Sequence, residues 1–108
     1  MGKPAFYRHE VRQGEDYSVN LDLKNPDGTA FNNSGYTGAS NIETLDGTIA
    51  ASFTVSFPDT DTVTLSLSKT VTAALSPRRY IHDLKLTDAG GLTTYWIEGD
   101  VIVSKGVS

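Results

Sequence analysis

Two residues of this chain, His9 and His82, have side chains that titrate near neutral pH. Hydrolysis through a serine nucleophile needs a histidine held between that serine and a carboxylate. The sequence contains no Gly-x-Ser-x-Gly turn to present such a serine. We expect His82 to be partly buried and hydrogen-bonded inside the core, and His9 to lie on an edge strand or an arm. No catalytic residue is predicted, and the chain is not expected to be an enzyme.

The acidic residues offer a second kind of chemistry, metal binding. Asp59 and Asp61 stand at alternate positions of a predicted turn, as some ligands of a calcium loop do, but no bidentate glutamate follows at a suitable distance. Asp46, Asp88 and Glu98 belong to no recognisable motif. The chain has no cysteine, which excludes disulfides and thiolate metal sites. We therefore expect solvated turn acids, no metal and no cofactor.

Aromatic side chains could stack on sugar rings. Tyr95 and Trp96 are adjacent, so on a strand they point to opposite faces. We expect Trp96 to fill the core, as a buried tryptophan often does in immunoglobulin-like sandwiches. Tyr95, Tyr36 or Tyr7 could then form an outer platform for a carbohydrate. Nothing in the sequence places these three tyrosines together.

Charge and hydropathy exclude two classes of partner. The formal net charge is −4, and the only adjacent basic pair is Arg78–Arg79, so a nucleic-acid track is not expected. No apolar run approaches the ~20 residues that span a bilayer, and residues 1–10 do not read as a signal peptide. Gly90 and Gly91 lie between predicted strands, where they indicate a hairpin and not a phosphate loop.

The elements that must position these residues are strands. Apolar residues alternate with polar ones in four runs, at 17–23, 53–57, 63–67 and 80–86, and a period of two is typical of strands with one buried face. Turn residues separate the runs at 25–28, 46–47, 58–61 and 88–91. Residues 98–100 indicate a bend or bulge between strands at 93–97 and 101–103. This spacing predicts a sandwich or small barrel.

One segment breaks the alternation. Residues 69–75 could form one or two helical turns, with Ser68 as N-cap and Pro77 beyond the end. The segment leads into Leu75-Ser76-Pro77-Arg78-Arg79-Tyr80, which has the spacing of a tyrosine corner. Tyr80 is thus predicted to pin the crossover through its hydroxyl. Arg78 stands where glycine is usual and would be strained if the turn required a positive φ.

These patterns predict one domain over residues 1–108. Its fold class is all-β: an immunoglobulin-like antiparallel β-sandwich of Greek-key type with about seven strands and one short helical crossover. Residues 1–8 and 104–108 are expected to be extended arms. We expect neighbouring subunits to hold them, since free chain ends usually fray.

Seven phrases, in this order, carry a family resemblance: residues 11–17 (VRQGEDY), 25–29 (NPDGT), 34–37 (SGYT), 63–68 (VTLSLS), 75–80 (LSPRRY), 83–88 (DLKLTD) and 98–101 (EGDV). Together they resemble the immunoglobulin-like module in the N-terminal domain of siphophage upper baseplate proteins. They are also similar to small stand-alone phage structural proteins. The resemblance spans residues 11–103.

The resemblance implies a structural component of a bacteriophage virion, in the tail or baseplate, that holds neighbouring subunits together. Its partners would be other virion proteins, including copies of itself, with no nucleic acid and no membrane. It would be assembled in the host bacterial cytoplasm and located in the virion. Two alternatives stand beside this hypothesis: a capsid decoration (cement) protein on the head and, from another class, a carbohydrate-binding adhesion module.

Overall fold

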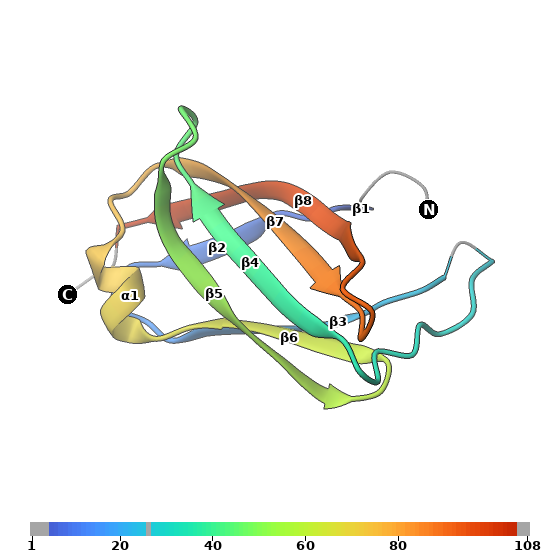
Figure 1. Ribbon diagram of the computed structural model, residues 1–108. Helices are drawn as coiled ribbons and strands as arrows, with labels where there is room; N and C mark the ends of the chain where they lie inside the picture. The colour runs from blue at the N-terminus through green and yellow to red at the C-terminus, as the bar shows by residue number, and fades with distance from the viewer. Residues whose placement is uncertain (1–4, 26, 106–108) are drawn as a thin grey trace.

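A computed structural model describes residues 5–25 and 27–105 (Figure 1). Along the chain the elements are β1 (Ala5–Phe6), β2 (His9–Arg12), β3 (Tyr17–Asp22), β4 (Thr37–Glu43), β5 (Ile49–Asp59), β6 (Thr62–Leu67), α1 (Lys69–Ala74), β7 (Arg79–Thr87) and β8 (Thr93–Ser104). Each predicted strand is present, and no helix within the described ranges is long and apolar enough to cross a membrane.

The strands form two layers that share one long strand. Hydrogen-bonded neighbours follow the order β1-β8-β7-β4-β5-β6-β3, and β2 also pairs with β8. The first half of β5 pairs with β4 in one layer, and its second half pairs with β6 in the other. Figure 1 shows β5 passing from one layer to the other, with α1 at one end of the sandwich. The prediction of an all-β immunoglobulin-like sandwich is confirmed.

The antiparallel pairing predicted for the sandwich does not extend to the N-terminal edge. β1 and β2 both pair with β8 in parallel, with Phe6 opposite Glu98 and His9 opposite Val101. A hairpin does not set this pairing, because β2 continues across the open side of the sandwich into β3 of the other layer. The predicted N-terminal arm is correspondingly shorter, since residues 5–6 already belong to the sheet. Residues 1–4 and 106–108 of the two predicted arms lie outside the described residues.

The core lies between the layers and follows the predicted alternation. Leu84 and Leu86 of β7, Val63 and Leu65 of β6, and Ile42 of β4 have no exposed surface. Burying a side chain of this size contributes roughly 1.5–3 kcal/mol. Trp96 is half-buried and packs on the ring of Phe31, with centroids 4.3 Å apart, so it borders the core and does not fill its centre.

The crossover and the tyrosine corner are as predicted. The Val71 amide donates to the hydroxyl of Ser68, the N-cap of α1, and the helix ends one residue before the predicted Leu75, which is the C-cap. The Tyr80 hydroxyl donates to the carbonyl oxygen of Ser76 over 2.9 Å. Only glycines have a positive φ among the described residues, so Arg78 carries no such strain.

The bend predicted at residues 98–100 is wrong. β8 continues through them, and the register instead shifts one step earlier: Leu84 pairs with Ile97 and Lys85 with Tyr95, which leaves Trp96 as the extra residue. Gly99 serves a different purpose. The backbone of Tyr7 passes so close to it that a side chain would not fit.

Candidate functional site

The two histidines meet inside the core. His9 is completely buried, His82 is 4% exposed, and their rings lie edge to face with centroids 4.4 Å apart. His9 Nδ1 is 2.7 Å from the Tyr17 hydroxyl, and His82 Nε2 is 2.7 Å from the carbonyl oxygen of Tyr7. Since a carbonyl oxygen only accepts, His82 Nε2 carries the proton. The pair joins β2, β3 and β7 across the open side of the sandwich.

Burial keeps this cluster uncharged. Burial first, and the neighbouring His82 second, together lower the pKa of His9 to about 3. Burial also lowers the pKa of His82, against smaller opposing effects from the Tyr7 carbonyl, Asp83 and Asp100. The pKa of Tyr17 is raised to about 12 by burial and by Tyr7 and Glu10. His9 Nε2 and His82 Nδ1 are buried without a hydrogen-bond partner in the described part of the chain.

Gly99 makes the His82 contact possible. It lies opposite His82 in the β7–β8 ladder, and a Cβ there would overlap the Tyr7 carbonyl oxygen and lie 2.9 Å from the carbonyl carbon. The Tyr7 amide donates to the Glu98 carbonyl over 2.9 Å, which fixes the N-terminal strand at this point. With no side chain at 99, the imidazole of His82 reaches over β8 to the carbonyl of Tyr7.

The histidine pair is therefore a structural feature. A general base works best with a pKa near the operating pH and must reach the proton that it removes. His9 meets neither condition, because its pKa is about 3 and its side chain has no exposed surface. The prediction of a hydrogen-bonded His82 is confirmed, although it is more deeply buried than expected. His9 lies on an edge strand, as predicted.

Two of the acidic residues predicted in turns, Asp46 and Asp88, accept hydrogen bonds within their own turns. Asp46 accepts from Thr44 and the Thr48 amide, and these hydrogen bonds lower its pKa. Asp88 accepts from the amides of Gly90 and Leu92 in the β7–β8 hairpin, where Gly91 has a φ of 91°. Asp59 is exposed at the end of β5, and Asp61 is half-buried in the following turn. Within residues 5–25 and 27–105, no three His, Cys, Asp or Glu side chains converge as metal ligands.

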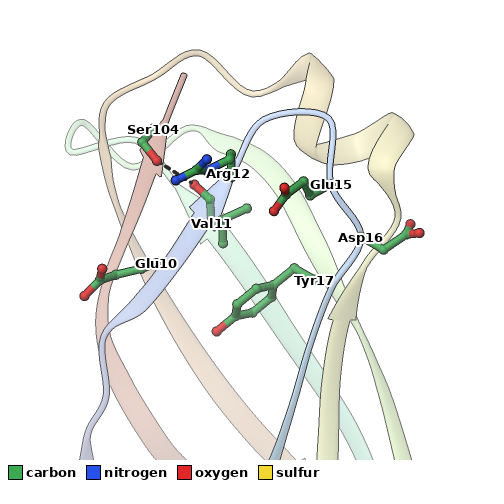
Figure 2. A pocket seen from close by; sticks show the side chains of 7 residues that line it. All are labelled: Glu10, Val11, Arg12, Glu15, Asp16, Tyr17 and Ser104. Atoms are coloured by element: carbon green, nitrogen blue, oxygen red, sulfur yellow. Dashed lines mark hydrogen bonds between the residues drawn. The ribbon is translucent and has the colours of Figure 1, made fainter. Parts of the chain in front are cut away.

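A shallow pocket of about 310 Å³ lies where β2 turns into β3 (Figure 2). Glu10, Arg12, Glu15, Asp16 and Tyr17 contribute to its wall. Figure 2 shows Glu10 and Asp16 pointing outward on opposite sides, while the Tyr17 ring lies beneath them. Glu10 and Asp16 therefore do not converge on a common point, and Arg12 and Glu15, which have opposite charges, lie between them.

A groove of about 420 Å³ on the outer surface of β1, β7 and β8 has more convergent chemistry. Phe6 and Tyr95 line it, and they are 66% and 49% exposed. Asp83 of β7 and Glu98 of β8 also line it and stand directly opposite each other in the ladder. We define these four side chains as the outer groove. Arg79, Ile81, His82, Gly99 and Asp100 complete the lining of the same groove.

A third carboxylate that lines the same groove, Asp100, is already paired with a cation. Asp100 accepts from Arg79 Nε over 3.0 Å and lies 2.8 Å from Arg79 Nη2, while Arg8 Nη2 is 3.6 Å away. The hydrogen bond from Arg79 holds the pKa of Asp100 below its usual value. The two arginines of the adjacent basic pair are thus divided: Arg79 begins β7, whereas Arg78 lies over the Tyr80 ring at 5.6 Å.

Sequence reasoning identified one of the four side chains of the outer groove. Of the three tyrosines considered for an outer platform, only Tyr95 is exposed, because Tyr7 packs on His9 and Tyr36 packs on Phe31. Phe6 was missed because it was assigned to an arm. Its parallel pairing with Glu98 brings it to the groove, and that pairing between distant parts of the chain leaves no local signal.

No known family model matches the chain, and no curated protein sequence matches it. Solved structures do share its fold. The Lin-41 filamin domain superposes with a TM-score of 0.54 at 13% identity, covering 90% of this chain and 84% of that chain. The titin M3 domain gives 0.53 at 13% identity, covering 96% and 95%.

A third solved structure is described as the structural basis of T cell specificity and activation by the bacterial superantigen toxic shock syndrome toxin-1. One of its chains gives a TM-score of 0.54 at 7% identity. It covers 89% of this chain and 92% of that chain. Structural similarity at such low sequence identity is evidence for the fold alone. The protein is an immunoglobulin-like, all-β sandwich.

Proposed function

We propose that this protein is a structural component of a bacteriophage virion, located in the tail or baseplate, where it holds neighbouring subunits together. The observation that supports this role is the contrast between a buried, uncharged histidine pair and an outer groove with exposed aromatic and acidic groups. The sandwich buries both of its histidines and presents exposed aromatic and acidic side chains for protein contacts on one sheet. The virion location itself draws on the seven ordered sequence phrases described above.

The mechanism in this proposal is mechanical. A rigid sandwich presents the outer groove and its open sheet edges, and neighbouring virion proteins, including further copies of this chain, dock there. The edge of β3, whose outward residues Ser18 and Asn20 are polar, can pair with another strand through its backbone. Symmetry of the particle would set the number of copies.

Quantitative mass spectrometry of purified particles tests this function. We expect the chain in the particle at roughly a few to a few tens of copies, the range for a tail or baseplate ring. A ratio near that of the major capsid protein would instead place it on the head as decoration. Absence from particles would overturn the structural role.

A carbohydrate-binding adhesion module is a second candidate, favoured by one observation. The outer groove combines two exposed aromatic rings with carboxylates that could accept hydrogen bonds from sugar hydroxyls. A glycan array probed with the protein tests this candidate, and binding abolished by Tyr95→Ala would support it.

A further inference from the structure

We propose that the outer groove binds an arginine side chain presented by a partner protein, with the guanidinium between Phe6 and Tyr95 and against Asp83 and Glu98. This inference deepens the proposed function, and it rests on that function only for the identity of the partner as a virion protein. The binding chemistry itself is argued from the four side chains of the groove.

The first argument is an uncompensated charge. Asp83 and Glu98 are directly opposite in the β7–β8 ladder, where the Cβ atoms of such a pair are roughly 4.5–5.5 Å apart. Like charges in this relation destabilise a sheet. Among the described residues, neither carboxylate lies within ion-pair distance of a lysine or arginine. Asp83 accepts only a long bond, 3.5 Å, from the Asn41 amide.

The second argument is the pair of aromatic rings, Phe6 and Tyr95, that line the groove. Phe6 stands opposite Glu98 on the β1 side, and Tyr95 stands opposite Lys85 on the β7 side. Both rings are largely exposed although they border a groove of about 420 Å³. A cation over an aromatic face gains roughly 0.5–2 kcal/mol. Rings beside carboxylates therefore favour a cationic ligand over an anionic or uncharged one.

The third argument comes from Asp100, two residues along β8 on the same outer surface. It is held by the guanidinium of Arg79, with two nitrogens within 3.0 Å of one oxygen. Asp100 is 7% exposed and has an arginine of this chain as partner, whereas Glu98 is exposed and has none among the described residues. The face already binds one arginine and has room for a second.

Arginine suits the groove better than lysine. Its planar fork matches two carboxylate oxygens and stacks on aromatic rings, whereas the ammonium of lysine is a compact and strongly hydrated point charge. Both charge complementarity and ring geometry therefore favour a guanidinium. We commit to an arginine on a loop of a protein partner.

The experiment is an NMR titration of the ¹⁵N-labelled protein with the acetylated, amidated peptide Gly-Thr-Arg-Thr-Gly. We expect saturable shifts confined to amides around Tyr95, Glu98 and Asp83. The same peptide with lysine should bind several-fold more weakly, and with glutamate not at all. The double variant Asp83→Asn/Glu98→Gln should weaken arginine-peptide binding at least about ten-fold.

The matched control is Asp22→Asn/Asp59→Asn, which removes the same charge from the outward side of the other layer. Equal weakening by this control would overturn the proposal, because it would show general attraction to an acidic protein. Shifts scattered over the surface, or none, would overturn it as well. So would saturable binding of a neutral glycan in this groove without arginine-peptide binding.

The two proposals can fail separately. Arginine-peptide binding by a protein that is absent from phage particles would support the groove and overturn the virion role. A protein present in particles whose groove binds no arginine peptide would give the reverse result.

Discussion

The two sides of the β7–β8 pair treat ionisable groups in opposite ways. On the inner side, His82 is 4% exposed, its pKa is lowered by burial, and it is tied to the Tyr7 backbone. One residue further, on the outer side, Asp83 faces Glu98, and among the described residues neither has a lysine or arginine within ion-pair distance. The same two strands therefore hold one group neutral for stability and leave the next pair charged and unmatched.

This difference separates polar groups that serve the fold from charged groups that are available to a partner. Buried polar groups tolerate few arrangements, because each unmet hydrogen bond costs about 1–3 kcal/mol. Groups on the outer surface are under no such constraint, so a like-charge pair between exposed aromatic rings is not explained by folding. It is the feature expected where a partner supplies the missing charge.

The largest expected effect is that of Gly99→Ala, which acts on the inner side. The new Cβ would overlap the Tyr7 carbonyl, so β1 must move and the His82–Tyr7 bond must break. We expect a loss of about 3 kcal/mol in the free energy of unfolding, measured by urea denaturation. Gly90→Ala is the control, since its Cβ would meet only the Asp88 carboxylate at 3.4 Å. Equal losses for the two variants would contradict the close approach.

The histidine pair predicts a stability that falls with acid. Both folded-state pKa values lie below the ordinary 6.5, so the unfolded chain binds more protons as pH drops below that value. The loss continues until His9 itself titrates, at about 3. Between pH 7.5 and 5 we expect His9 alone to lower the free energy of unfolding by about 2 kcal/mol, and His82 to add to this loss.

Urea denaturation at a series of pH values measures this slope. Carboxyl groups titrate mainly below the window, and the chain has only these two histidines. The variant His9→Phe keeps an aromatic ring in the cluster and should remove the His9 contribution, about 2 kcal/mol over this pH range, leaving only the contribution of His82. An unchanged slope in this variant would show that His9 is not the group that titrates.

Tyr80→Phe tests another inner-side polar group of β7. It removes the 2.9 Å hydrogen bond to the Ser76 carbonyl, while the ring remains buried. Because Ser76 is exposed, water can satisfy the freed carbonyl, and we expect a loss of only about 1 kcal/mol. Thermal unfolding measures it. Tyr36→Phe, whose ring packs on Phe31, serves as the control and should change little.

Local patterns were enough to predict most of the fold. Alternation marked β3, β6 and β7, and the Leu-x-Pro-x-x-Tyr spacing located the tyrosine corner. These features depend on neighbouring residues, so a single sequence carries them. The prediction failed at Gly99, which was assigned to a bend, because its neighbour Tyr7 is 92 positions away in the chain.

The candidate site was harder to predict for the same reason. Tyr95 was identified as an outward aromatic, but Phe6, Asp83 and Glu98 come from three strands. Two long-range pairings, one parallel, bring them together. The meeting of His9 and His82 likewise depends on β2 lying along β8, which no local signal of the sequence encodes.

The smallest expected effect is on the outer side. It is a gain in the free energy of unfolding, whereas the changes described above lower it. Asp83→Asn removes one charge of the facing pair while its side-chain oxygen can still accept from the Asn41 amide. We expect the isolated protein to gain about 0.5 kcal/mol, a rise of roughly 2 °C in Tm at low salt. The gain should vanish in 1 M salt, where charges are screened beyond ~3 Å. Asp100→Asn should instead lower Tm, because it removes the partner of Arg79. A loss of stability in Asp83→Asn would mean that the pair is already compensated within the chain, and the groove would then have no charge left for a partner to match.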